Sequence, residues 1–152
     1  MSKGQVEFKW IGTNRLGEKL AKEASKRQKA VARAAKVAGL AVQASARKAI
    51  LRDSHTGIVY GNHQASAPYE SPANDTGNLA RGIVVLADEQ SGIAYIISRA
   101  PYSAALEYGS TYVMPNGKVR FTAERPFMWP ALAENIPKIK DLFKKALAKG
   151  ET

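Results

Sequence analysis

The sequence predicts an α+β fold with a long N-terminal helix, a small antiparallel sheet of about four strands and a C-terminal helix. Three observations predict it. Residues 14–52 contain no proline and repeat their apolar side chains with a helical period. Short β-branched runs bounded by turn residues follow within residues 56–124. Residues 126–149 return to helical spacing. The length of 152 residues fits one domain over residues 1–152.

The chain is predicted to begin with an arm or a first strand over residues 1–13. The long helix then starts after a cap at Thr13 or Asn14, since both side chains can accept a hydrogen bond from the first turn. Gly39 lies inside this helix at a cost of about 1 kcal/mol relative to alanine, and it marks a bend or a close contact.

The apolar face of this helix is rich in alanine. At 100° per residue its members fall in one arc: Leu16, Leu20, Ala24, Val31, Ala35, Ala38 and Val42. Small side chains bury little area, and burial contributes only about 25 cal/mol per Å². We therefore expect the helix to need a partner surface, either from its own domain or from a neighbouring subunit.

The middle of the chain reads as strands and turns. A strand at residues 57–61 precedes a long loop, residues 62–75, and a helical turn capped by Asp75 or Thr76. Further along, the pattern predicts a hairpin of residues 83–86 and 92–98, a short helix at 101–108, and a hairpin of residues 112–114 and 119–121 around Asn116-Gly117.

The C-terminal helix is expected to start near Pro130, since proline is favoured in the first helical turn. Its apolar residues, from Leu132 to Leu147, keep a helical period. Pro137 interrupts that period, so it either kinks the helix or opens a second one.

The net charge of +10 is concentrated in one element. Between Arg15 and Arg52 there are eleven basic and two acidic residues, a balance of +9, which leaves +1 for the remainder. Seven of these cations form one helical face, here called the basic stripe: Arg15, Lys19, Lys22, Lys26, Lys29, Arg33 and Lys36. A solvated face, contact with DNA phosphates and docking onto an acidic protein ring are all compatible with it. Base-specific recognition is not indicated, because the stripe lacks Asn, Gln and aromatic residues.

Catalytic and metal-binding patterns find no support. Asp75-Thr76-Gly77 resembles the aspartic-protease triplet, but its flanks are polar where that triplet needs an apolar strand and a second carboxylate. His55 and His63 have no zinc-site spacing, and the chain has no cysteine. We expect no enzymatic activity, no metal and no cofactor.

Aromatic residues gather in the second half of the chain. About half of them should be core, and the others are candidates for a subunit interface, where tyrosine and tryptophan are enriched. The interface candidates are Tyr102, Tyr108, Tyr112, Phe127 and Trp129.

Three strings, in order, resemble a family of tailed-bacteriophage neck proteins, also called minor tail or tail-completion proteins. They are Ser71-Pro72-Ala73-Asn74-Asp75-Thr76-Gly77-Asn78-Leu79-Ala80-Arg81-Gly82-Ile83, Tyr102-Ser103-Ala104-Ala105-Leu106-Glu107-Tyr108-Gly109-Ser110 and Arg125-Pro126-Phe127-Met128-Trp129-Pro130-Ala131-Leu132. That family is typified by Pro-x-x-Thr-Gly-x-Leu, Tyr-Ala-x-x-Val-Glu-x-Gly-Thr and Arg-Pro-Phe-x-x-Pro-Ala. An alanine-rich basic first helix is also similar.

The strings have local physical explanations as scaffold. Gly77 permits a tight helix entry, Leu79 points into the core, and Gly109 ends the helix that contains Glu107. Pro126 and Pro130 set the chain direction before the last helix. The expected scaffold residues are Thr76, Gly77, Leu79, Glu107, Gly109, Pro126, Phe127 and Pro130.

The resemblance implies a structural virion protein that forms a hexameric or dodecameric ring at the head–tail junction, through which DNA passes. Its expected partners are copies of itself, portal, adaptor or head-closure proteins and tail-tube or tail-terminator proteins, with non-specific DNA contact in the lumen. We expect the protein to be located in the virion after assembly in the host cytoplasm. Residues 1–9 lack the apolar run of a signal peptide, and no membrane contact is expected. The alternative is a small basic protein that binds nucleic acid non-specifically.

Overall fold

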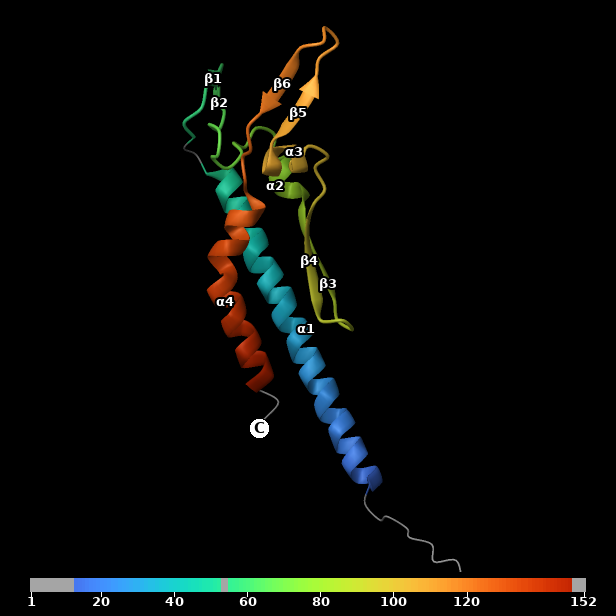
Figure 1. Cartoon of the computed structure of the whole chain (residues 1–152). Helices are drawn as coiled ribbons and strands as arrows, with labels where there is room; N and C mark the ends of the chain where they lie inside the picture. Colours follow the sequence, from blue (N-terminus) through green and yellow to red (C-terminus); the bar gives the residue numbers. More distant parts are fainter. Residues whose placement is uncertain (1–12, 53–54, 149–152) are drawn as a thin grey trace, which may run out of the picture.

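The computed structural model describes residues 13–52 and 55–148 (Figure 1). The predicted arm or first strand falls almost entirely on residues 1–12, outside the described ranges.

Two helices form the spine of the molecule. Helix α1 (Thr13–Leu51) is 39 residues long, and helix α4 (Met128–Ala148) packs along its C-terminal part (Figure 1). Thr13 and Asn14 are both helical, so the prediction that one of them caps the helix is wrong. Helix α4 continues through Pro137 as one element, so Pro137 does not open a second helix.

Six short strands form three separate antiparallel hairpins, where the sequence had predicted one sheet of about four strands. They are β1 (Val59–Tyr60) with β2 (His63–Gln64), β3 (Ile83–Asp88) with β4 (Ile93–Ser98), and β5 (Ser110–Val113) with β6 (Val119–Thr122). Hairpin β3–β4 lies along α1, whereas the other two hairpins extend past the C-terminal end of α1 (Figure 1). Strand β2 falls inside the predicted long loop.

Two short helices connect these hairpins, α2 (Asn78–Gly82) and α3 (Ser103–Tyr108). The predicted cap of α2 by Asp75 or Thr76 is wrong, because the cap position is Gly77 in a left-handed conformation without a side-chain hydrogen bond. Arg81 instead donates to the Thr76 carbonyl at 2.8 Å and ties this turn together. Gly109 follows α3 with φ 74°, as predicted for a glycine that ends the helix.

The core lies where α1, α2, the start of β3 and the start of α4 meet. Its buried members are Val42, Ala46, Ile50, Leu79, Ala80, Ile83, Ala100, Phe127 and Ala131. The predicted burial of Leu79 is therefore confirmed. Gly39 marks a close contact, since a Cβ there would lie 2.9 Å from Val85 Cγ1 on β3.

None of the helices in the described ranges is both long enough and apolar enough to cross a membrane.

Candidate interaction surfaces

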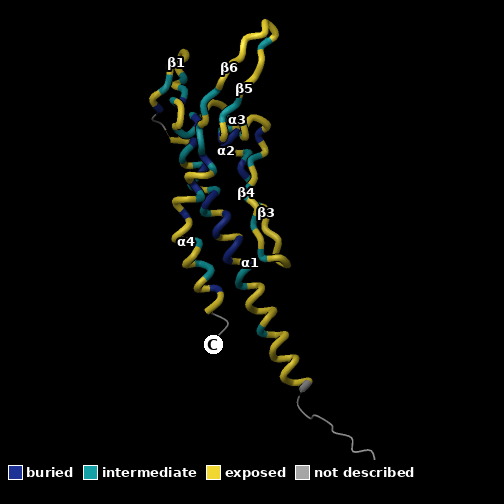
Figure 2. The backbone as a smooth tube through the Cα atoms, viewed as in Figure 1, coloured by how far each residue is buried: buried dark blue, intermediate teal, exposed yellow. Residues whose placement is uncertain are grey.

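The first sixteen residues after Thr13 project from the body of the molecule. Residues 14–29, here called the spike, are exposed on every side except at half-buried Glu23 (Figures 1 and 2). The spike extends beyond the C-terminal end of α4 and beyond the tip of hairpin β3–β4 (Figure 1). At that tip, the Gln28 side-chain amide of the spike donates a hydrogen bond to the Gln90 carbonyl.

All seven residues of the basic stripe are exposed. Within the described ranges, Lys26 is the one member that makes an ion pair, to Glu23 Oε1 at 2.8 Å. The Lys26 side-chain hydrogen bond also holds the pKa of Glu23 below its usual value. Because both partners are exposed, this pair contributes little to stability. The stripe is thus a concentrated charge that its own fold leaves almost uncompensated.

The position of this charge destabilises the helix that carries it. The spike carries six basic and two acidic residues, a balance of +4, and its first turn has no acid. The N-terminal end of a helix carries a partial positive charge, so cations there destabilise it. Helices of this length without packing are marginal in water. An anionic or apolar partner would offset both effects.

The C-terminal end of the stripe has a different environment. Lys29, Arg33 and Lys36 surround a depression of about 430 Å³ together with Ala87 and Glu89 of hairpin β3–β4. Lys29 at the end of the spike, and Arg33 and Lys36 after it, therefore lie beside an acidic hairpin tip, whereas Arg15 to Lys26 lie along the rest of the spike.

The aromatic interface candidates divide into two groups. Tyr102, Tyr108, Tyr112 and Trp129 are exposed, and Trp129 is 64% exposed on the first turn of α4. Phe127 is only 1% exposed and belongs to the core, so its assignment to an interface is wrong. Its side chain belongs to the buried cluster that joins α1 to the start of α4, which a count of aromatic residues does not reveal.

Glu107 has a role that local sequence reasoning missed. Its buried carboxylate reaches from α3 to the start of α4, where Oε2 accepts from the backbone N–H of Phe127 at 2.9 Å and of Met128 at 3.0 Å. Oε1 accepts from Trp129 N–H at 2.9 Å. Pro130 follows without an N–H. One side chain thus accepts hydrogen bonds from the backbone N–H groups that the first turn of α4 leaves without a helical partner. It also connects the second of the three strings, residues 102–110, to the third, residues 125–132.

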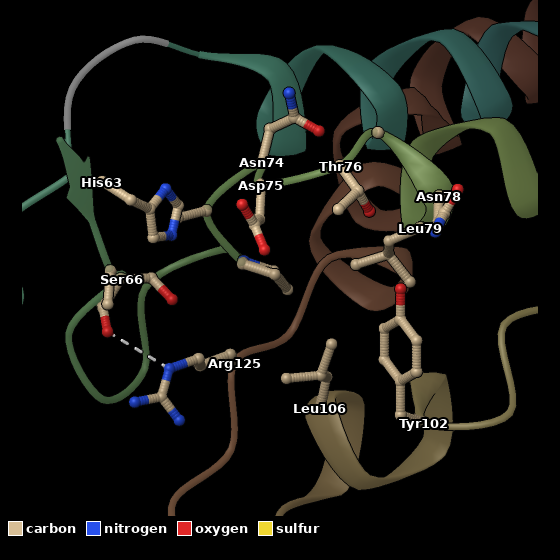
Figure 3. A pocket seen from close by; sticks show the side chains of 14 residues that line it. His63, Ser66, Asn74, Asp75, Thr76, Asn78, Leu79, Tyr102, Leu106 and Arg125 are labelled. Atoms are coloured by element: carbon tan, nitrogen blue, oxygen red, sulfur yellow. Dashed lines mark hydrogen bonds between the residues drawn. The ribbon is translucent and has the colours of Figure 1, made fainter. Parts of the chain in front are cut away.

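A pocket of about 330 Å³ opens between the loop before α2 and helix α3 (Figure 3). Asp75, Thr76 and Gly77 line it with His63, Tyr102 and Arg125. Asp75 is the one carboxylate among its lining residues, so no pair of carboxylates is assembled there. Arg125 is bonded to another lining residue of the pocket, since its Nε donates a hydrogen bond to the Ser66 carbonyl oxygen at 3.2 Å. In the described chain, no three Asp, Glu or His side chains come together as a metal site.

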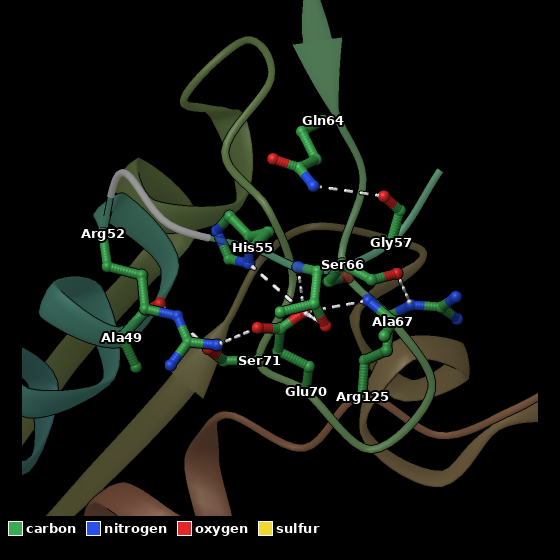
Figure 4. A network of polar contacts seen from close by, with 11 residues as sticks. Ala49, Arg52, His55, Gly57, Gln64, Ser66, Ala67, Glu70, Ser71 and Arg125 are labelled. Atoms are coloured by element: carbon green, nitrogen blue, oxygen red, sulfur yellow. Dashed lines mark hydrogen bonds and ion pairs between the residues drawn. The ribbon is translucent and has the colours of Figure 1, made fainter. Parts of the chain in front are cut away.

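Glu70 organises the segment that follows α1 (Figure 4). Its Oε2 accepts from the backbone N–H of Thr56 at 3.0 Å and of Ala67 at 2.9 Å, and its Oε1 pairs with Arg52 at 2.5 Å. Buried His55 lies beside it, with Nδ1 3.9 Å from Oε2. The Thr56 and Ala67 backbone hydrogen bonds hold the pKa of Glu70 below its usual value. These bonds attach the β1–β2 segment to the end of α1.

The lowered pKa of Glu70 predicts a stability that depends on pH. A carboxyl whose pKa is lower in the folded state stabilises the fold above its unfolded pKa and loses that contribution as pH falls through the folded value. Glu70→Gln should therefore be less stable than the natural chain near pH 7, and the difference should shrink near pH 3. Urea unfolding at both pH values measures it, and a difference that does not change with pH would contradict this assignment.

The structure thus brings the three neck-like strings together as scaffold and leaves the basic stripe and four aromatic residues on the surface. Sequence reasoning missed Glu107 as a cap and the apolar face of hairpin β3–β4 that is turned away from α1. The available sequence signals were the apolar residues at alternate positions 93, 95 and 97, and a glutamate twenty residues before a helix start. Comparison with protein-family models, with curated proteins and with solved structures finds no match to this chain.

Proposed function

We propose that this chain is a structural subunit of a tailed-phage virion that assembles into a hexameric or dodecameric ring at the head–tail junction, around the passing DNA. Copies of itself and the adjoining portal-side and tail-side proteins are its partners. Its role is assembly, without catalysis. The observation that carries the proposal is the amount of surface that the subunit leaves uncovered.

This surface can be estimated. The chain exposes 11619 Å². Residues 1–12, 53–54 and 149–152, even if counted as fully exposed at about 160 Å² each, account for about 2,900 Å². A compact monomer of the remaining size would expose about 6,800 Å². Roughly 1,900 Å² is thus in excess, about the area that a standard protein–protein interface buries.

The three neck-like strings support the position in the virion. Their residues build one connected scaffold through Glu107, Phe127 and Leu79, with the spike and the hairpins attached to it. A scaffold that displays a basic helix at one end and apolar hairpins elsewhere suits a subunit that is completed by neighbours.

Native mass spectrometry and negative-stain microscopy of the full chain test the proposal, alone and mixed with the products of the genes that flank its own. We expect a closed ring of six or twelve copies, and contact with a portal-side or tail-side protein. A chain that remains monomeric in every mixture would refute the proposal.

The alternative of a non-specific nucleic-acid-binding protein is favoured by one observation, the exposure of the whole basic stripe. A gel-shift series in increasing salt separates the two functions. A dedicated binder holds duplex DNA at submicromolar concentration in physiological salt, with a steep salt dependence. A ring subunit binds DNA weakly as a free monomer.

Trp129→Ala is expected to weaken ring assembly without destabilising the subunit. The side chain is exposed, so the free energy of unfolding should change by less than about 0.5 kcal/mol. Loss of a tryptophan from an interface weakens association by about 2 kcal/mol or more, roughly thirtyfold. Unfolding in urea and mass photometry measure the two effects. Phe127→Ala is the contrasting variant, because it removes core packing and should cost about 3–5 kcal/mol of stability.

A further inference from the structure

Hairpin β3–β4 is apolar on both of its faces. The inner face packs on α1, where Val85 and Ala94 approach Gly39. The opposite face, here called the outer face, consists of the facing pairs Val84–Ile97, Leu86–Tyr95 and Asp88–Ile93. Four of these side chains, Leu86, Ile93, Tyr95 and Ile97, are between 41% and 55% exposed. An antiparallel hairpin with one solvated face normally carries polar residues there, so this face lacks a cover.

The spike carries a second uncovered apolar surface. Leu16 and Leu20, here called the leucine edge, are 59% and 61% exposed. At 100° per residue they lie on the side of α1 that holds Ala34 and Val37, which line a groove of about 590 Å³ with Leu142 and Ala146 of α4. The edge therefore continues the face that α4 covers, past the point where α4 ends.

The two surfaces carry opposite charges. Residues 83–98 of the hairpin contain Asp88 and Glu89 and no basic residue, a balance of −2, against +4 for the spike. Two spikes packed together would place +4 against +4, and two hairpins would place −2 against −2. Pairing of unlike surfaces is thus favoured over a symmetric pairing of like ones.

We infer that the outer face of hairpin β3–β4 in one copy receives the leucine edge of the spike of the next copy. This inference rests on the proposed function, since it names the self-contact of the assembly. A head-to-tail contact of two different surfaces repeats around a ring or along a filament. Each chain then buries its outer face and its leucine edge, and the roughly 1,900 Å² in excess is enough for one such interface per chain.

Site-directed cross-linking tests the contact, because the natural chain contains no cysteine. Leu20→Cys and Tyr95→Cys chains are mixed in equal amounts and treated with a short bismaleimide, which tolerates wider thiol separations than a disulfide does. The yield of this mixed dimer should exceed that of Leu20→Cys with Ala133→Cys at least about tenfold, Ala133 being an exposed residue of α4 outside both surfaces. A chain with both Leu20→Cys and Tyr95→Cys should give a ladder of covalent multimers.

Tyr95→Lys gives an independent measurement. It places a cation on the face that meets the basic spike, so the Kd of self-association should rise at least about tenfold, whereas Ala133→Lys, on the exposed side of α4, should leave it unchanged. Equal cross-linking of the test and control pairs, or an unchanged Kd in Tyr95→Lys, overturns the contact. If the natural chain still forms rings in that case, the proposed function stands. If the natural chain stays monomeric with and without its neighbours, both are refuted.

Discussion

Glu107→Ala should lower the free energy of unfolding by about 3 kcal/mol, the largest effect expected of a single polar substitution in this subunit. The carboxylate accepts three backbone N–H groups at the first turn of α4, at 2.9, 3.0 and 2.9 Å. Alanine leaves these donors without a partner in a place that is shielded from water. It also removes a negative charge from the positive end of the helix. Since α4 covers α1, the loss extends to the core.

Two further variants make this measurement specific. Glu107→Gln keeps an accepting oxygen and the side-chain volume but loses the charge and one acceptor, so its destabilisation should be smaller than that of Glu107→Ala. Glu124→Ala removes an exposed carboxylate nearby and should change stability by less than about 0.5 kcal/mol. Urea unfolding followed by circular dichroism gives the three values. A Glu107→Ala chain as stable as the natural one would show that water satisfies these donors.

The sequence predicted the elements whose signals are local. Helical periodicity located α1 and α4, Asn116-Gly117 located the β5–β6 turn, and the β-branched runs located β3 and β4. It could not predict that the strands form three separate hairpins. Pairing between hairpins depends on contacts between residues far apart in the chain, and alternation within each strand is the same whether or not a neighbour exists.

The surface could be predicted only in part. The basic stripe was correctly placed on one exposed face, because cation spacing and helix geometry determine it. The burial of Phe127 and the long-range cap by Glu107 were not foreseen, since each depends on how α3 and α4 meet. The same limit applies to Leu16 and Leu20, which follow a core-like pattern although α4 is too short to cover them.

Replacing Lys22, Lys26, Lys29 and Arg33 together with glutamine should abolish productive assembly or genome retention while leaving the fold intact. All four side chains are exposed, and within residues 13–52 and 55–148 only Lys26 of the four has an ion pair, so the helical content and the unfolding free energy should stay close to those of the natural chain. The stripe would fall from seven cations to three. If DNA phosphate is its partner, the slope of log K against log salt should decrease by about 3.6, roughly 0.9 for each lost contact.

The matched control removes four cations elsewhere. Lys118, Lys138, Lys140 and Lys144 are also exposed, and replacing them with glutamine lowers the net charge from +10 to +6, as the stripe variant does. A defect confined to the stripe variant assigns the effect to the position of the charge, whereas equal defects in both assign it to net charge alone. Natural particle yield and infectivity with the stripe variant would mean that these cations are merely solvated, because a surface that binds an anionic partner cannot lose four of its seven charges without weaker binding.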